Sequence, residues 1–131
     1  MKHIRAKSNW VTLFILVCLS VPTPVFAHAK VISTDPAPRS TLSRPPVSIN
    51  ILFNQLFEPA YSSITVKRAD GSVLATEKAS VDPSNQKRLV LLLPVLPAGQ
   101  YTVSYKVLSL DGHTISSTYS FRIKKENPRP H

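Results

Sequence analysis

Short apolar runs, each separated from the next by proline or turn residues, constrain this chain more than any other feature. The sequence contains 12 prolines, and a proline inside a helix removes a hydrogen-bond donor and clashes with the preceding turn. Long helices are therefore disfavoured, whereas the intervals between the prolines suit strands. Several short strands at this spacing predict an all-β fold, a small β-sandwich in one domain. The seven expected strands are 29–33, 47–53, 63–67, 72–76, 88–93, 101–108 and 115–123.

Turn residues separate these runs at fixed points. The dipeptides Asp70-Gly71 and Asp111-Gly112 each lie between two apolar runs, and glycine readily adopts the positive φ that a tight hairpin turn needs. Between residues 101 and 107 large apolar side chains alternate with polar ones. Alternation of this kind places one face of the strand in a core.

The first 27 residues have the character of a secretory signal peptide. Lys2, Arg5 and Lys7 precede a nearly continuous apolar stretch at 11–21, and small or aliphatic residues lead up to Ala27. The apolar stretch is about half as long as a membrane span, which needs roughly 20 residues, so an uncleaved anchor is disfavoured. We therefore expect a signal peptide at 1–27, cleavage after Ala27 and a periplasmic protein.

Removal of this segment changes what the composition allows. The remaining 104 residues divide into a domain at 28–124 and a flexible C-terminal tail at 125–131. The only Cys and the only Met of the chain, Cys18 and Met1, leave with the signal peptide. The processed protein then has no sulfur, which excludes a disulfide framework, a thiol nucleophile and a soft metal site.

Basic residues outnumber acidic ones by 16 to 7, but they are scattered along the sequence. They cluster only as doublets at 67–68, 87–88 and 124–125. Because no basic stripe is interleaved with aromatic residues, we expect a solvated surface and no nucleic-acid binding.

Two of the three histidines of the processed chain occupy positions suited to metal binding. His28 becomes the first residue, so its α-amine and its imidazole can chelate one ion together. Asp111 and His113 follow a predicted strand and lie two residues apart, so in an extended segment their side chains point the same way. A sandwich gathers its loops at two ends, where the start of the first strand can meet this distant loop.

An amine, two imidazoles and a carboxylate form a donor set of nitrogen and oxygen. This set suits Cu(II) best, with Ni(II) as a weaker competitor, and Zn(II) stays open as well. Each half of the proposed site also has an explanation that involves no metal. An N-terminal histidine can follow from where a signal peptide happens to end, and Asp-Gly-His can be an ordinary polar turn.

Four segments of the sequence resemble the CopC family of periplasmic copper-binding, copper resistance proteins. They are 28–37, 51–63, 97–103 and 109–113, and the opening His-Ala and the late Asp-Gly-His are the specific part. The resemblance implies a seven-stranded Greek-key sandwich, Ig-like or cupredoxin-like, that binds one Cu(II) per chain. It places the metal ligands on His28, Asp111 and His113.

The sequence also departs from the family pattern. Gln55 stands where some members have a glutamate, so either Gln55 or water is left to complete the coordination. The processed chain has no methionine for the Met-rich Cu(I) site of some members. Tyr105 stands where the family often has tryptophan, a change that a core position tolerates with repacking.

From these features we expect a copper carrier and not an enzyme. The protein would be a monomer that sequesters copper, or delivers it to a CopD-like inner-membrane copper transport protein, in copper resistance or homeostasis. Electron transfer is disfavoured because a blue-copper site needs a thiolate. Two alternatives stay open. One is a copper monooxygenase with an N-terminal histidine chelate, against which Asp111 would occupy the coordination space that oxygen needs. The other is a metal-free structural or adhesion sandwich.

Overall fold

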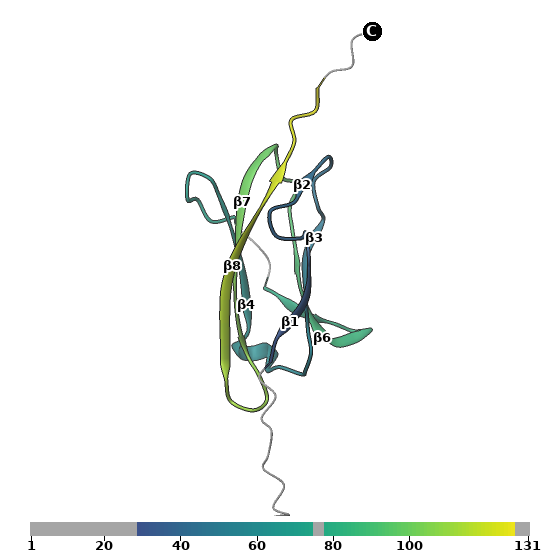
Figure 1. Cartoon of the computed structure of the whole chain (residues 1–131), viewed down its shortest axis with the longest axis vertical. Helices are drawn as coiled ribbons and strands as arrows, with labels where there is room; N and C mark the ends of the chain where they lie inside the picture. The colour runs from purple at the N-terminus through teal and green to yellow at the C-terminus, as the bar shows by residue number, and fades with distance from the viewer. Residues whose placement is uncertain (1–28, 75–77, 128–131) are drawn as a thin grey trace, which may run out of the picture.

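Two β-sheets packed face to face make up the computed structural model, which describes residues 29–74 and 78–127 (Figure 1). The strands are β1 (Val31–Asp35), β2 (Thr41–Leu42), β3 (Ser48–Phe53), β4 (Ser63–Arg68), β5 (Ser80–Asp82), β6 (Asn85–Leu92), β7 (Gly99–Leu108) and β8 (Thr114–Ile123), and a short 3₁₀ helix, η2 (Pro59–Tyr61), precedes β4. One sheet has the order β1-β3-β6-β5 and the other the order β2-β8-β7-β4. Within the described ranges, no helix is long and apolar enough to cross a bilayer. The predicted β-sandwich is confirmed.

The structure differs from the predicted strand list between β4 and β6. Residues 72–74 contribute one bridge, between Lys67 and Val73, and residues 75–77 lie outside the described part. The described residues instead form β5, and β2 is a further addition, so they hold eight strands where we expected seven. β2 has two residues and β5 has three, which is too short for an alternating pattern to be visible.

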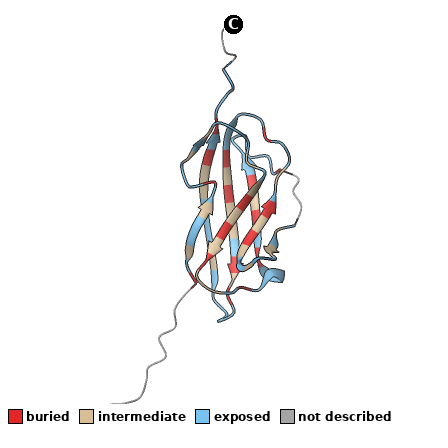
Figure 2. Cartoon of the chain, turned by 90° about the vertical axis from the view of Figure 1, so that its right-hand side faces the viewer, coloured by how far each residue is buried: buried red, intermediate tan, exposed pale blue. Residues whose placement is uncertain are grey.

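The core lies between the two sheets and follows the predicted alternation (Figure 2). On β7 the side chains of Tyr101, Val103 and Val107 are buried, and Tyr105 packs against the same cluster from a half-buried position. Each buried side chain of this size contributes about 1.5–3 kcal/mol relative to exposure. The hydroxyl of Tyr101 donates a hydrogen bond to the carbonyl of Pro97 over 2.6 Å, so the loop before β7 is fixed to the core.

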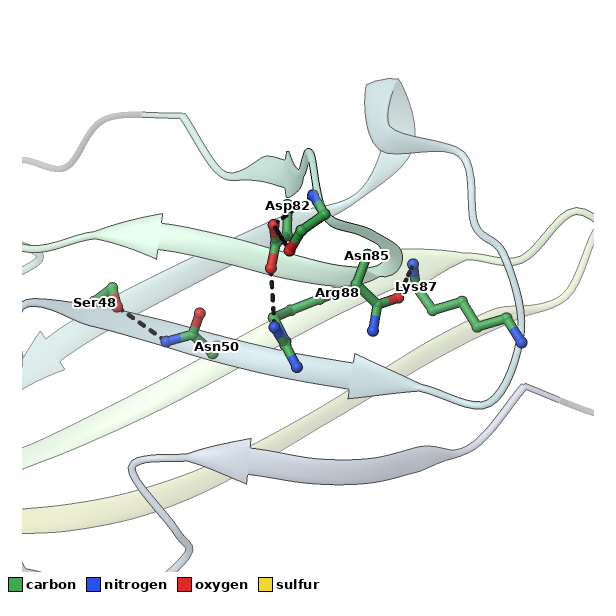
Figure 3. A network of polar contacts seen from close by, with 7 residues as sticks. Ser48, Asn50, Asp82, Asn85, Lys87 and Arg88 are labelled. Carbon is green, nitrogen blue, oxygen red and sulfur yellow. Dashed lines mark hydrogen bonds and ion pairs between the residues drawn. The ribbon is translucent and has the colours of Figure 1, made fainter.

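Polar contacts occupy the outer face of the β1-β3-β6-β5 sheet (Figure 3). Arg88 on β6 donates to the carboxylate of Asp82 on β5 over 2.9 Å. The same carboxylate accepts hydrogen bonds from the backbone N and the hydroxyl of Ser84, which close the turn between these strands. On β3 the amide of Asn50 donates to the hydroxyl of Ser48. The contacts of Asp82 fasten the short edge strand β5 to β6.

The sandwich has two distinct ends. The end that we call the hairpin end holds Ala29–Lys30, residues 54–62 and the β7–β8 turn at 109–113. We call the opposite end the tail end. It holds the loops at 43–47, 69–73 and 93–98, together with residues 122–127, which comprise the last residues of β8 and those that follow it. Figure 1 shows the β7–β8 turn at one extremity and the exit of the C-terminal segment at the other.

Candidate metal centre

The β7–β8 turn brings Asp111 and His113 together. The backbone N of Ser109 donates to the carbonyl of His113 over 2.9 Å, and the N of Gly112 donates to the carbonyl of Ser109 over 3.0 Å. Gly112 has φ +88, a conformation that residues with a Cβ adopt at a cost. The turn is therefore tight, and it joins two strands that pair with each other along their length.

The Asp111 carboxylate is the polar centre of this turn. Its Oδ1 accepts hydrogen bonds from the buried hydroxyl of Ser109 and from the backbone N of His113, the second at 3.1 Å. The Nδ1 of His113 lies 3.2 Å from the same oxygen. The predicted pairing of Asp111 with His113 thus occurs, but its predicted geometry was wrong. The two side chains converge through a turn that the aspartate itself organises, not through an extended segment.

Hydrogen bonding holds this carboxylate in its ionised form. The Ser109 hydroxyl and then the His113 backbone N–H lower the pKa of Asp111 from 3.8 to about 2. Its side chain is 21% exposed and that of His113 is 55% exposed, so both can be reached from solvent. An accessible carboxylate beside an imidazole is a pair of donors that Cu(II), Ni(II) and Zn(II) all accept.

The beginning of the described chain lies at the same end as this turn. The backbone N of Lys30 donates to the Oδ1 of Asn54 over 2.7 Å, and the N of Asn54 donates back to the carbonyl of Lys30 over 3.0 Å. Further along the same segment, Phe57 forms a β-bridge with Ser109. Residues 54–57 therefore connect the start of β1 to the turn that carries Asp111.

The remaining predicted ligand, His28, lies outside the described residues. Ala29, which follows it, is the first described residue and is buried. Gln55 is half-buried in the segment that joins the start of β1 to the turn. Across residues 29–74 and 78–127, no group of three or more His, Cys, Asp or Glu side chains is close enough to hold a metal ion. Of the three predicted ligands, the described part of the chain contains two, Asp111 and His113.

An aromatic cluster packs against the hairpin end on its core side. The rings of Phe53 and Phe57 meet edge to face with centroids 5.4 Å apart, and Tyr105 approaches Phe53 in the same manner at 6.2 Å. Phe57 is the residue bridged to Ser109, so the turn is anchored to the core through its first residue. Tyr105 occupies its predicted place against the core and fills part of this cluster.

Sequence reasoning missed two buried serines at this end. The hydroxyl of Ser62 donates to the carbonyl of Glu58 over 2.8 Å and lies 3.4 Å from the backbone N of Leu108. Ser109 directs the Asp111 carboxylate. A signal for Ser109 was present in its place directly after a predicted strand and two residues before Asp111, because serine and aspartate side chains form hydrogen bonds within turns.

Comparison with known proteins shows the family of this fold. The CopC domain profile matches residues 31–124. The chain is 28% identical over 120 residues to the copper transport protein CutJ of Bacillus subtilis, covering 91% of this chain but only 22% of that longer protein. CopC from Methylosinus trichosporium OB3b superposes with a TM-score of 0.71 at 30% identity, covering 77% of this chain and 99% of the other. PcoC, described as a methionine-rich copper resistance protein of Escherichia coli, superposes with a TM-score of 0.66 at 25% identity, covering 75% of this chain and all of the other. The chain therefore belongs to the CopC family.

Proposed function

We propose that this chain is a periplasmic Cu(II)-binding protein that sequesters copper or delivers it to a membrane partner. The observation that carries the proposal is the turn in which Asp111 and His113 lie together, at the end of the sandwich where the described chain begins at Ala29. Membership of the CopC family supports copper as the cargo.

His28 supplies the remaining donors in this proposal. Cleavage after Ala27 makes its amine and imidazole available to one ion, and consecutive Cα atoms are about 3.8 Å apart, so His28 stays next to Ala29. Ala29 is buried and Lys30 bonds to Asn54 in both directions, which fixes the chain directly after the chelating residue. A fixed neighbour reduces the entropy lost when the metal is bound.

The donor set favours Cu(II) over Cu(I). Nitrogen and oxygen ligands suit the divalent ion, whereas Cu(I) prefers thiolate and thioether sulfur, which the processed sequence lacks. The PcoC neighbour is described as methionine-rich, so this chain retains the shared fold without that sulfur supply. The described residues contain one turn that brings an aspartate and a histidine together, so we propose one copper ion per chain.

A carrier role fits the exposure of the donors. His113 is more than half exposed, so a copper ion held there is accessible to a receiving protein. Part of the surface around the turn is apolar, because Leu56, Tyr61 and Leu110 are all exposed at the hairpin end. In our proposal this end meets a CopD-like membrane protein, and the chain acts as a monomer without a catalytic step.

The sharpest test compares the protein that begins at His28 with one that retains Ala27. The retained residue converts the amine into an amide, so the proposal expects weaker Cu(II) binding and a changed electron paramagnetic resonance spectrum. A protein with one extra alanine after His131 serves as the matched control and should bind as the parent does. Unchanged affinity and spectrum in the Ala27 form would reject the chelate.

Substitution of the other donors tests the rest of the site. Asp111→Asn and His113→Gln should each weaken Cu(II) binding by more than the roughly 10- to 100-fold that loss of an outer-shell partner costs. His131→Gln, which changes the third histidine, should leave the affinity unchanged. Reductant-dependent peroxide or oxidised glycan products from the copper-loaded protein would contradict the carrier role.

A further inference from the structure

Basic side chains that are far apart in the sequence meet at the tail end of the sandwich. A shallow depression of about 660 Å³ is lined by Gln100, Arg122, Lys124 and Lys125. Two neighbouring depressions share Gln100 with it, and they add Arg39 on one side and Arg68 on the other. All five cations are exposed.

The strand pairing explains this gathering. β4 and β8 both end at the tail end, on either side of the first residues of β7, where Arg68 pairs with Tyr101 and Arg122 pairs with Gln100. β2 pairs with β8 on the outer side, and the backbone N of Arg39 donates to the carbonyl of Ser120. The topology thus collects charges that the sequence spreads over more than 80 positions.

Little negative charge opposes these cations. Among residues 29–74 and 78–127, the acidic side chains at the tail end are Asp70 and Glu126, with Asp35 further back at the end of β1. The carboxylate of Asp70 accepts hydrogen bonds from the backbone N and the hydroxyl of Ser72, so it is directed into its own turn. Arg44 and Lys67 add further positive charge at this end.

Exposed apolar side chains project from the same end. Val95 is 91% exposed in the loop at 93–98, and Val47 is 79% exposed in the loop before β3. Val73 and Leu92 are also more than half exposed. Val73 lies in the loop at 69–73 and Leu92 is the last residue of β6, so both are at the tail end of the sandwich. The loop that carries Val95 continues into Pro97 and Ala98, which line the basic depression.

We propose that the tail end is a docking surface for an anionic phospholipid bilayer. Cations attract the negative headgroups, and isolated apolar side chains at the loop tips enter the headgroup boundary. A soluble polyanion would use the cations alone and would leave Val47 and Val95 without a role. A single-stranded nucleic acid would require exposed aromatic rings among the cations, and within residues 29–74 and 78–127 the exposed large aromatic side chain, Tyr61, lies at the opposite end.

Docking in this way orients the molecule. The hairpin end, with Asp111 and His113, then points away from the bilayer, so a docked molecule holds copper in the sequestering mode and leaves the bilayer surface before that end meets a membrane partner. The docking surface shares no residue with the copper site, so this inference stands or falls separately from the proposed function.

The first test measures sedimentation with phosphatidylcholine vesicles, with and without phosphatidylglycerol, at low salt. The protein beginning at His28 should bind only the vesicles that contain phosphatidylglycerol. Each cation near an anionic surface contributes a factor of about five, so the triple variant Arg68→Gln, Arg122→Gln, Lys124→Gln should bind about 100-fold more weakly. The matched control, Lys30→Gln, Lys87→Gln, Lys106→Gln, removes the same charge elsewhere and should lose far less.

The second test uses a fluorescent reporter, because the chain after residue 27 contains no tryptophan. Val95→Trp at the tail end should show a blue-shifted emission when anionic vesicles are added. Leu110→Trp at the hairpin end should show no shift with the same vesicles. Both variants place the ring at an exposed site, so folding should be unaffected.

Three results would overturn the proposal. They are equal binding to both kinds of vesicle, equal losses in the two triple variants, and binding to a soluble polyanion such as polyglutamate without binding to vesicles. The Cu(II) spectrum of the tail-end triple variant should match that of the parent, which separates a failure of docking from a failure of the copper site.

Discussion

The buried hydroxyl of Ser109 donates a hydrogen bond to the carboxylate of Asp111, two residues further along the β7–β8 turn. The serine lies on the core side of the turn and the aspartate on the solvent side, so the contact fixes the direction of the carboxylate. Asp111 is a proposed copper ligand, and the serine is then a positioning residue behind it.

Substitution Ser109→Ala should weaken Cu(II) binding by about 10- to 100-fold, because outer-shell partners of metal ligands contribute that much. Isothermal titration and the Cu(II) spectrum measure the change, and Ser109→Thr should restore part of the affinity. The turn at the tail end supplies a control, since the hydroxyl of Ser72 donates to Asp70 over 2.6 Å, with the serine two residues after the aspartate instead of before it. Ser72→Ala should leave copper binding unchanged, and equal losses in both variants would argue against positioning.

Substitution Gln55→Glu should strengthen Cu(II) binding. Gln55 lies in the segment between the start of β1 and the Asp111 turn, and a carboxylate there adds negative charge near the proposed ion. Competition titration against a copper chelator measures the gain. Glu58→Gln removes a charge from an exposed position nearby and serves as a comparison, and no gain in the Gln55→Glu protein would place residue 55 outside the site.

Acid should destabilise the protein in part through Asp82. The hydroxyl and backbone N–H of Ser84, followed by Arg88, lower the pKa of this carboxyl below 3.8 in the folded state. The unfolded chain therefore takes up the proton first, and the stabilisation that is present above the unfolded pKa is lost as the pH falls through the folded value. Thermal unfolding as a function of pH should show a shallower acid loss in Asp82→Asn than in the parent. Parallel curves would contradict this assignment.

Alkali should destabilise the protein through Tyr119. Burial raises the pKa of this phenol from 10.0 to about 12, although the nearby Thr34 hydroxyl lowers it in part. Neither hydroxyl has a hydrogen-bond partner of normal geometry within the described residues. The folded state keeps its proton longer than the unfolded chain, so stability falls as the pH rises from about 10 to about 12.

Tyr119→Phe should remove that part of the alkaline loss, with little cost at neutral pH because no normal hydrogen bond is broken. Phenolate absorbance and the unfolding temperature report the two effects separately. Tyr61→Phe, at an exposed tyrosine, is the control and should leave the alkaline profile unchanged.

Much of the fold could be predicted because its long strands carry a clear alternation. β7 and β8 have ten residues each; buried or half-buried positions recur at every second residue of β7 from Tyr101 to Val107, and β8 buries Phe121 and Ile123 near its end. β2 and β5 could not be found in this way, because two or three residues hold no period and their pairing depends on β8 and β6. Of the expected strand at 72–76, the described residues form one bridge, between Lys67 and Val73, and residues 75–76 lie outside the described part.

The candidate site was predictable only in part. The pairing of Asp111 with His113 follows from their spacing, but the role of Ser109 depends on how the turn folds back on itself. The basic surface at the tail end was invisible in the sequence for a different reason. Arg39, Arg68 and Arg122 are isolated or paired in the sequence and come together only through strand order.

The length of β7 and β8 sets how far the two ends can influence each other. A ten-residue strand spans about 30 Å at about 3.3 Å per residue. Salt at physiological strength screens exposed charges over about 8 Å. The positive potential of the tail end therefore decays within a fraction of the strand length, so it does not repel an approaching cation at Asp111. Charged residues can therefore be added or removed at one end of the sandwich without changing the electrostatic potential at the other end.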